Sequence, residues 1–162
     1  MYEDPIIKKY LELIKASVPE IKFYYQGDPV RIPKSNLPAV ILSKSQTQVS
    51  PLTNAEDAHQ LSLILTVVTD VRDERNDEHE MTPGIAQLYD IIEGRENTTY
   101  ALKAKSILNI LRTNQIVDAA YNLRTDLGTI TRADYGLTIG KRSEGYATEG
   151  QVEFIATYSQ IR

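Results

Sequence analysis

The stretch that decides the fold is AHQLSLILTVVTDV, residues Ala58–Val71. Odd-numbered positions carry most of its strongly apolar side chains, namely Leu61, Leu63, Leu65, Val67 and Val71. Alternation with a period of two is typical of a β-strand that buries one face. The stretch is also long for a strand in a small domain. We therefore expect a long strand that projects from its sheet.

Upstream of this strand the sequence predicts one helix and two further strands. Asp4–Val18 has apolar residues at helical spacing, a proline in its first turn and another proline directly after it. Ile21–Gln26 is rich in aromatic and β-branched residues, and Pro38–Lys44 contains a short apolar run, so both are predicted to be strands. The polar segment Ser45–Asp57 is predicted to be a loop or an extended arm.

Downstream the sequence predicts two helices and a meander of three strands. The helices are Gly84–Glu93, which is followed by a glycine stop signal, and Tyr100–Arg112. The strands are Tyr121–Arg132, Tyr135–Gly140 and Gln151–Gln160, which alternate apolar and polar residues.

This order of elements predicts an α+β fold that forms a single domain over residues 1–162. We expect a mostly antiparallel sheet flanked by an N-terminal helix and one or two central helices. A chain of this length buries enough surface to fold without a metal or a disulfide. It also contains no cysteine.

Composition excludes several classes of function. The formal net charge is −4, which argues against tight binding of nucleic acid, because phosphate contacts require clustered lysine and arginine. No apolar run reaches the roughly 18 residues of a membrane span, and the mixed-charge N-terminus does not resemble a signal peptide. We therefore expect a cytoplasmic protein that does not bind a membrane.

Catalytic and metal-binding signals are weak. Residues 70–80 carry enough carboxylates for a hard cation, but Arg72 and Arg75 interrupt them and no glycine supplies a turn, so a solvated loop is the preferred interpretation. The two histidines, His59 and His79, lack the paired spacing of a zinc helix. Neither Gly-x-Gly-x-x-Gly nor Gly-x-Ser-x-Gly occurs. We predict no catalytic residue, no metal site and no cofactor.

A protein interface is the more probable kind of site on compositional grounds. The chain holds 10 tyrosines against 2 phenylalanines and no tryptophan, and tyrosine combines a large contact area with a polar tip. The segments expected to project are Ser45–Asp57 and Arg142–Gly150. The interface residues predicted on and beside them are Val49, Pro51, Leu52, His59 and Tyr146.

The order of elements resembles that of the tail terminator, or tail completion, proteins of long-tailed bacteriophages. The matching features are the helix Asp4–Val18, the strand pair Pro38–Lys44 and Ala58–Val71, the helix Tyr100–Arg112 and the closing strand Gln151–Gln160. The resemblance spans nearly the whole chain. It is one of pattern, because the family has no signature motif, and no residue role follows from it.

The resemblance implies a subunit of a hexameric ring that caps the tail tube at the head-proximal end of the virion tail after assembly in the host cytoplasm. The implied partners are further copies of the chain, the tail tube protein and a neck or head-completion protein. DNA would pass through the ring without specific binding, and no enzymatic activity is expected. A second hypothesis, from another class, is a small α+β binding module or a metal-dependent enzyme that uses residues 70–80.

Overall fold

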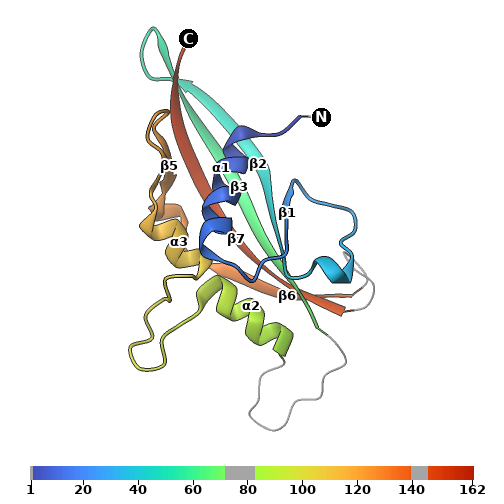
Figure 1. The fold of residues 1–162 in the computed structure, drawn as a ribbon. Helices are drawn as coiled ribbons and strands as arrows, with labels where there is room; N and C mark the ends of the chain where they lie inside the picture. The colour runs from blue at the N-terminus through green and yellow to red at the C-terminus, as the bar shows by residue number, and fades with distance from the viewer. Residues whose placement is uncertain (1, 72–82, 140–145) are drawn as a thin grey trace.

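A computed structural model describes residues 2–71, 83–139 and 146–162 (Figure 1). The helices in this part of the chain are α1 (Pro5–Ser17), α2 (Pro83–Glu93) and α3 (Ile107–Thr113). The strands are β1 (Phe23–Gln26), β2 (Ala39–Pro51), β3 (Glu56–Asp70), β4 (Ile116–Asp118), β5 (Leu123–Asp126), β6 (Ala133–Ile139) and β7 (Tyr146–Ile161). Two short 3-10 turns are η1 (Lys34–Asn36) and η2 (Leu127–Thr129). The predicted α+β class is confirmed.

The strands form one mixed, mostly antiparallel sheet. Its order is β1-β2-β3-β7-β5-β4, with β6 also paired to β7. Only the β1–β2 pair is parallel among the strand pairs of the described residues. The three longest strands, β2, β3 and β7, lie next to one another and run the length of the molecule (Figure 1). They form a ribbon to which the other elements are attached.

The pairing of β3 is continuous on both of its edges. Its register with β7 runs from Glu56 opposite Ile161 to Asp70 opposite Ala147. On the other edge it pairs with β2 from Val68 opposite Ala39 to Asp57 opposite Pro51, with one irregularity at Lys44. The strand predicted as Ala58–Val71 is therefore confirmed as β3, and the structure places it between β2 and β7.

The two faces of the sheet bury cores of different size. All three helices pack on one face (Figure 1), where the large core is built around alternate residues of the ribbon, including Leu63, Leu65, Val152 and Phe154. The smaller core on the opposite face consists of Ile32, Leu37, Ala39, Ile41, Val68 and Ala147. We call the first surface the helix face and the second the open face.

Helix α1 is set by its cap and by one buried tyrosine. The Asp4 side chain accepts hydrogen bonds from the first-turn amides of Ile6 and Ile7, as an N-cap does. The fully buried Tyr10 lies 5.2 Å, between ring centroids, from Phe154 of β7. Its hydroxyl is 2.7 Å from Thr125 Oγ1 of β5, and burial raises the pKa of Tyr10 to about 12. The predicted N-terminal helix is confirmed.

The predicted end of β2 is wrong. The sequence predicted a strand ending at Lys44 and a loop or arm over Ser45–Asp57, whereas β2 continues to Pro51 and β3 begins at Glu56. The connecting loop is only 52–55. The polar residues of this segment form a regular hairpin because the neighbouring β3 satisfies their backbone groups, which local propensity does not reveal.

The predicted helix Tyr100–Arg112 begins seven residues later, at Ile107. Ser106 caps it by accepting a hydrogen bond from the amide of Asn109. The residues before the cap form a tight loop closed by a bridge between Arg95 and Leu102. Tyr100 lies at the tip of this loop with φ of 58°, a left-handed conformation that a helix does not allow.

Two strand predictions near the C-terminus also change. Tyr121–Arg132 is not one strand but β5 followed by η2, and Asn122 makes the turn into β5 with φ of 52°. The strand predicted as Gln151–Gln160 is longer at both ends, so residues 146–150, predicted as loop, belong to β7.

Gly150 tests the packing of the helix face. A Cβ at this position would lie closer than van der Waals contact to Ile92 Cδ1 and 3.0 Å from the ring of Tyr135. Ile92 is fully buried, so neither neighbour can move cheaply. We expect Gly150→Ala to lower the free energy of unfolding by about 1–3 kcal/mol, measured by urea denaturation.

The matched control is Gly136→Ala on β6, where a Cβ would meet nothing within 4 Å. This variant should stay within about 0.5 kcal/mol of the parent. Equal effects at the two glycines would contradict the packing described here.

Candidate functional site

The upper part of the ribbon leaves the body of the molecule. β1 pairs only with Ala39–Leu42 of β2, and α1 starts at the level of Lys44, whose ammonium group pairs with the carboxylate of Asp4. Beyond Thr157 of β7, where the pairing with β5 ends, β2, β3 and β7 continue as a three-stranded projection (Figure 1). We call residues 45–60 of the hairpin and 157–162 of β7 the arm.

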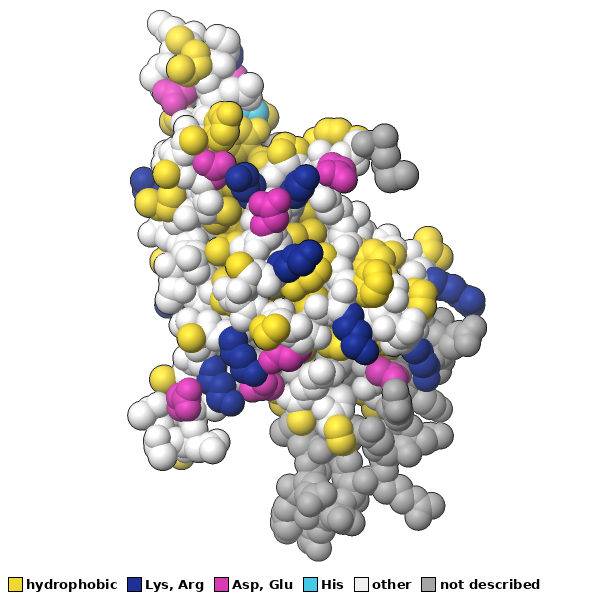
Figure 2. Space-filling model, in the orientation of Figure 1, with side chains coloured by type: hydrophobic (Ala, Val, Ile, Leu, Met, Phe, Trp, Pro, Cys, Tyr) yellow, Lys and Arg dark blue, Asp and Glu magenta, His cyan; other side chains and the backbone are white. Residues whose placement is uncertain are grey.

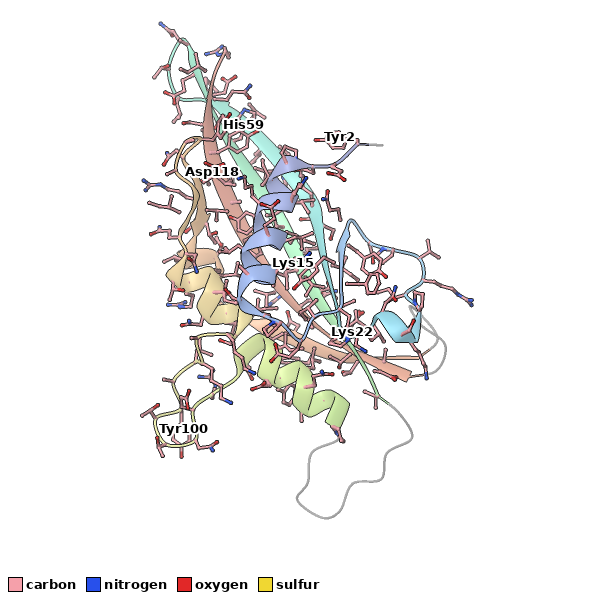
Figure 3. All side chains as sticks on the ribbon, viewed as in Figure 1. Tyr2, Lys15, Lys22, His59, Tyr100 and Asp118 are labelled. Carbon is pink, nitrogen blue, oxygen red and sulfur yellow. The ribbon has the colours of Figure 1, made fainter. Side chains whose placement is uncertain are left out.

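An apolar row crosses the helix face of the arm. Val49 lies opposite His59, and His59 lies opposite Tyr158. The His59 and Tyr158 rings stack with centroids 4.5 Å apart and planes 11° apart. Figure 3 places His59 well above α1 on the arm. Tyr158 also packs against the large core, so the row continues the core outward to Val49, which is 56% exposed.

The tip of the arm is fastened by the last residue of the chain. The Arg162 guanidinium donates to the carbonyl of Thr53 at 2.7 Å and lies 3.2 Å from the carboxylate of Asp57. Its backbone amide donates to the carbonyl of Ala55 at 2.8 Å. These bonds hold the 52–55 loop against the end of β7. Leu52 in this loop remains 58% exposed, so the tip presents an apolar side chain on an ordered turn.

The arm differs from the body in its charge. No charged residue occurs from Ser45 to Ala55. Figure 2 shows a projection that is mostly white and yellow, whereas lysine, arginine and acidic side chains gather on the body below it. Because uncharged surface costs little to desolvate compared with charged surface, the arm is suited to contact another protein.

The junction between body and arm is electrostatic. Burial acts to raise the pKa of Asp4, but the hydrogen bond from Lys44 and those from the amides of Ile7 and Ile6 outweigh burial. The pKa of Asp4 is therefore below its ordinary value. The same carboxylate caps α1 and binds β2 at the base of the arm, so it fixes the helix relative to the ribbon.

The structure gathers four of the five predicted interface residues on the arm: Val49, Pro51, Leu52 and His59. Tyr146 is separated from them. It pairs with Ile139 at the other end of the 16-residue strand β7, 12 residues from Tyr158, which lies opposite His59; at about 3.3 Å per residue this puts it roughly 40 Å from His59. Tyr146 is therefore not part of the surface formed by the other four predicted interface residues.

Sequence reasoning missed the contribution of β7 to this surface. Tyr158 and Arg162 complete the arm, although the segments expected to project were Ser45–Asp57 and Arg142–Gly150. The alternation of apolar residues up to Tyr158 was visible in the sequence. Its pairing with His59 was not, because the register of two distant strands leaves no local signal.

Other candidate sites receive less support. Of the acidic residues in segment 70–80, only Asp70 lies in the described residues, so the metal hypothesis falls outside them. Within the described residues, no group of three histidine, aspartate or glutamate side chains converges as metal ligands. In the same residues, no helix is long and apolar enough to cross a membrane.

A groove of about 890 Å³ lies between η1, the end of β3 and the start of α2. Charged side chains on it pair within the protein: Lys34 lies 3.8 Å from Asp70, and Lys105 lies 2.7 Å from Glu20. The ion pair with Lys105 is the main reason that the pKa of Glu20 is lowered. These pairs fasten neighbouring elements and do not converge on a common point as substrate-binding groups do.

No protein-family model matches the chain, and no curated protein sequence matches it significantly.

Asp4→Asn tests the junction. Asparagine keeps the cap but removes the charge that binds Lys44, so we expect a loss of up to about 1 kcal/mol in the free energy of unfolding at pH 7. A carboxyl whose pKa is lowered by folding stabilises the protein above its unfolded pKa, and this stabilisation is lost as the pH falls through the folded value. The difference between parent and variant should therefore shrink below about pH 4.

The measurement is chemical denaturation at pH 7 and at pH 3. Glu12→Gln is the control, since Glu12 is an exposed carboxylate on the same helix. A difference between Asp4→Asn and the parent that is the same at both pH values would contradict the proposed junction.

Proposed function

We propose that this protein is a structural subunit of virion assembly that caps the tail tube of a long-tailed bacteriophage. It acts as a ring, with six subunits as the resemblance implies, at the head-proximal end of the tail. There it stops elongation of the tube and presents the surface to which the head is joined. It acts as a structural part and performs no chemical turnover.

The observation that carries this proposal is the arm. Its apolar row, uncharged edge and fastened tip fit a rigid surface for protein contacts. Interfaces are depleted of charge at their centre and enriched in aromatic side chains. The His59–Tyr158 stack flanked by Val49 and Leu52 has this composition. The alternative of a binding module or metal-dependent enzyme acting through residues 70–80 has no such support in the described residues.

The shape of the molecule also suits a capping role. A tube of stacked rings grows without limit unless a terminal ring offers one face that fits the tube and another that does not. In this chain the arm and the helical body are chemically different surfaces at opposite ends of one ribbon (Figure 2). The net charge of −4 is compatible with a ring through which DNA passes, because like charges repel.

The arm is too small to hold two subunits together alone. Six residues of strand span about 20 Å and three strands about 15 Å, so one face of the arm covers roughly 300 Å². Stable interfaces bury about 800 Å² on each partner. Ring formation should therefore depend on concentration and on the tube as a template.

Sedimentation velocity over a wide range of protein concentrations tests this dependence. We expect monomers at low concentration and a higher oligomer only at high concentration or with tube protein present, since the arm contact is weak and the subunits repel. A dimer that persists at every concentration, with no larger species, would count against a ring.

Capping itself is tested by adding the purified protein to tail tube protein under assembly conditions and measuring tube length by electron microscopy. The parent protein should arrest elongation and, when labelled, should lie at tube ends. Val49→Ser and Leu52→Ser should weaken arrest, because hydrophobic contacts carry most of the affinity at such interfaces. Both side chains are more than half exposed, so stability should change by less than about 0.5 kcal/mol.

Val30→Ser is the matched control for Val49→Ser. Val30 is 90% exposed and lies in the loop before η1, away from the arm. It should cap as well as the parent. Tubes of unchanged length with no label at their ends, seen with the parent protein, would refute the proposed function.

A further inference from the structure

We propose that the arms of neighbouring copies pair edge to edge, with the outer edge of β2 in one copy against the outer edge of β7 in the next. The inference rests on the proposed ring and specifies its contact. It names the partner of the arm as a second copy of this chain, bound by strand addition.

The arm has an open edge on each side. On one side, β1 covers β2 only as far as Leu42, and within the described residues no strand pairs with the outer edge of Ser45–Pro51. On the other side, β5 covers β7 only over Ile155–Thr157. In the part of the chain that the structure describes, no strand covers the outer edge of Tyr158–Ile161. Each edge therefore presents backbone donors and acceptors available for a further strand.

The two edges match in height and direction. Ser50 of β2 lies opposite Ala58 of β3, which lies opposite Ser159 of β7. Both outer strands are antiparallel to β3, so they run parallel to each other. Rotation of the chain about an axis along the arm therefore brings β2 of one copy beside β7 of the next with the same polarity. This contact is heterologous, which is the kind that closes a ring.

The chemistry of the β2 edge also favours a second copy. Natural proteins protect exposed edges with lysine or other charges, whereas Ser45–Ala55 carries none. Lys44, at the base of the edge, is held by Asp4. A chain of net charge −4 can approach its own copy along this edge without placing like charges opposite each other.

Because a single arm contact is small, each copy needs to make it with both of its neighbours. The uncovered β7 edge is only four residues long, Tyr158–Ile161, or roughly 13 Å of strand, so one edge contact buries far less than the roughly 800 Å² per partner of a stable interface. A copy that uses both of its edges makes two contacts, and the apolar row of Val49, His59 and Tyr158 then continues from one arm to the next on the same side of the joined sheet.

Disulfide trapping tests the pairing, because the chain contains no cysteine. The double variant Ser50→Cys with Ser159→Cys places one thiol on each outer strand, on the open face. Within one chain these positions are two strand spacings apart, about 10 Å, which exceeds the roughly 7 Å that a disulfide allows. Any bond formed therefore joins two copies.

After mild oxidation at high protein concentration, we expect loss of the monomer band on a non-reducing gel and a ladder of covalent oligomers that reductant collapses. Either single variant should remain monomeric. Two further pairs, Gln48→Cys with Ser159→Cys and Ser50→Cys with Ile161→Cys, both test one alternative register, in which β2 lies two residues nearer the C-terminal end of the neighbouring β7. Thermal unfolding of the reduced variants checks that each retains the fold.

Three outcomes would overturn the pairing. One is the absence of a ladder from all three double variants. Another is a covalent dimer from Ser50→Cys alone, which would show that two β2 edges meet. The third is a covalent dimer from Ser159→Cys alone, which would show that two β7 edges meet. Tube capping by the reduced variants is measured separately. If they cap tubes but form no ladder on oxidation, edge pairing is rejected and the proposed function stands. If the parent protein itself fails to cap tubes, the proposed function is rejected.

Discussion

The structure depends on one constraint, the pairing of β3 on both edges, with β7 along its whole length and with β2 along most of it. Fifteen residues of β3 lie opposite β7, and nearly as long a stretch lies opposite β2. Since side chains alternate between faces, a slip of one residue would move Leu63 and Leu65 away from the helices. The position of the large core, the seat of α1 and the height of the arm all follow from this single register.

The one irregularity in the β2–β3 pairing lies where the body becomes the arm. The register shifts between Lys44 and Gln46, so two residues of β2 occupy the place of one, as in a β-bulge. Successive side chains of β2 point to opposite faces of the sheet, so without this shift Val49 would lie on the open face. With it, Val49 lies on the same side as His59 and Tyr158, and Lys44 remains on the side of α1, within reach of Asp4. This one extra residue of β2 therefore places Val49 in the apolar row and leaves Lys44 within reach of Asp4.

Sequence reasoning predicted those elements whose signal is local. About a dozen adjacent residues are enough to recognise the cap at Asp4, the helical spacing of α1 or the alternation of apolar and polar residues in β3. The outer half of β2 could not be predicted in this way, because its residues are polar and exposed on both faces and are held in a strand by β3. The start of α3 was misplaced for a related reason: helix-forming residues precede Ser106, but the bridge between Arg95 and Leu102 holds them in a loop.

The same reasoning explains why the candidate site was found only in part. Val49, Pro51, Leu52 and His59 share one hairpin, so their proximity follows from neighbouring sequence. Tyr158 and Arg162 reach the arm through the long-range register of β7, and Tyr146 is carried to the opposite end by the same strand. The hairpin residues and the β7 residues differ only in how far apart they lie in the sequence, since all of them are of types common at interfaces.

An uncharged open edge is normally a liability, because it invites uncontrolled pairing with other chains. In this protein its length limits the risk. The open stretches are short, and the face behind them covers only roughly 300 Å², so a single contact between two copies is weak. A closed ring gains one more contact than an open row of the same number of copies, and that extra contact costs no further loss of translational freedom. A weak edge can therefore favour closure over open aggregates, provided that the curvature of the joined arms allows the last copy to meet the first.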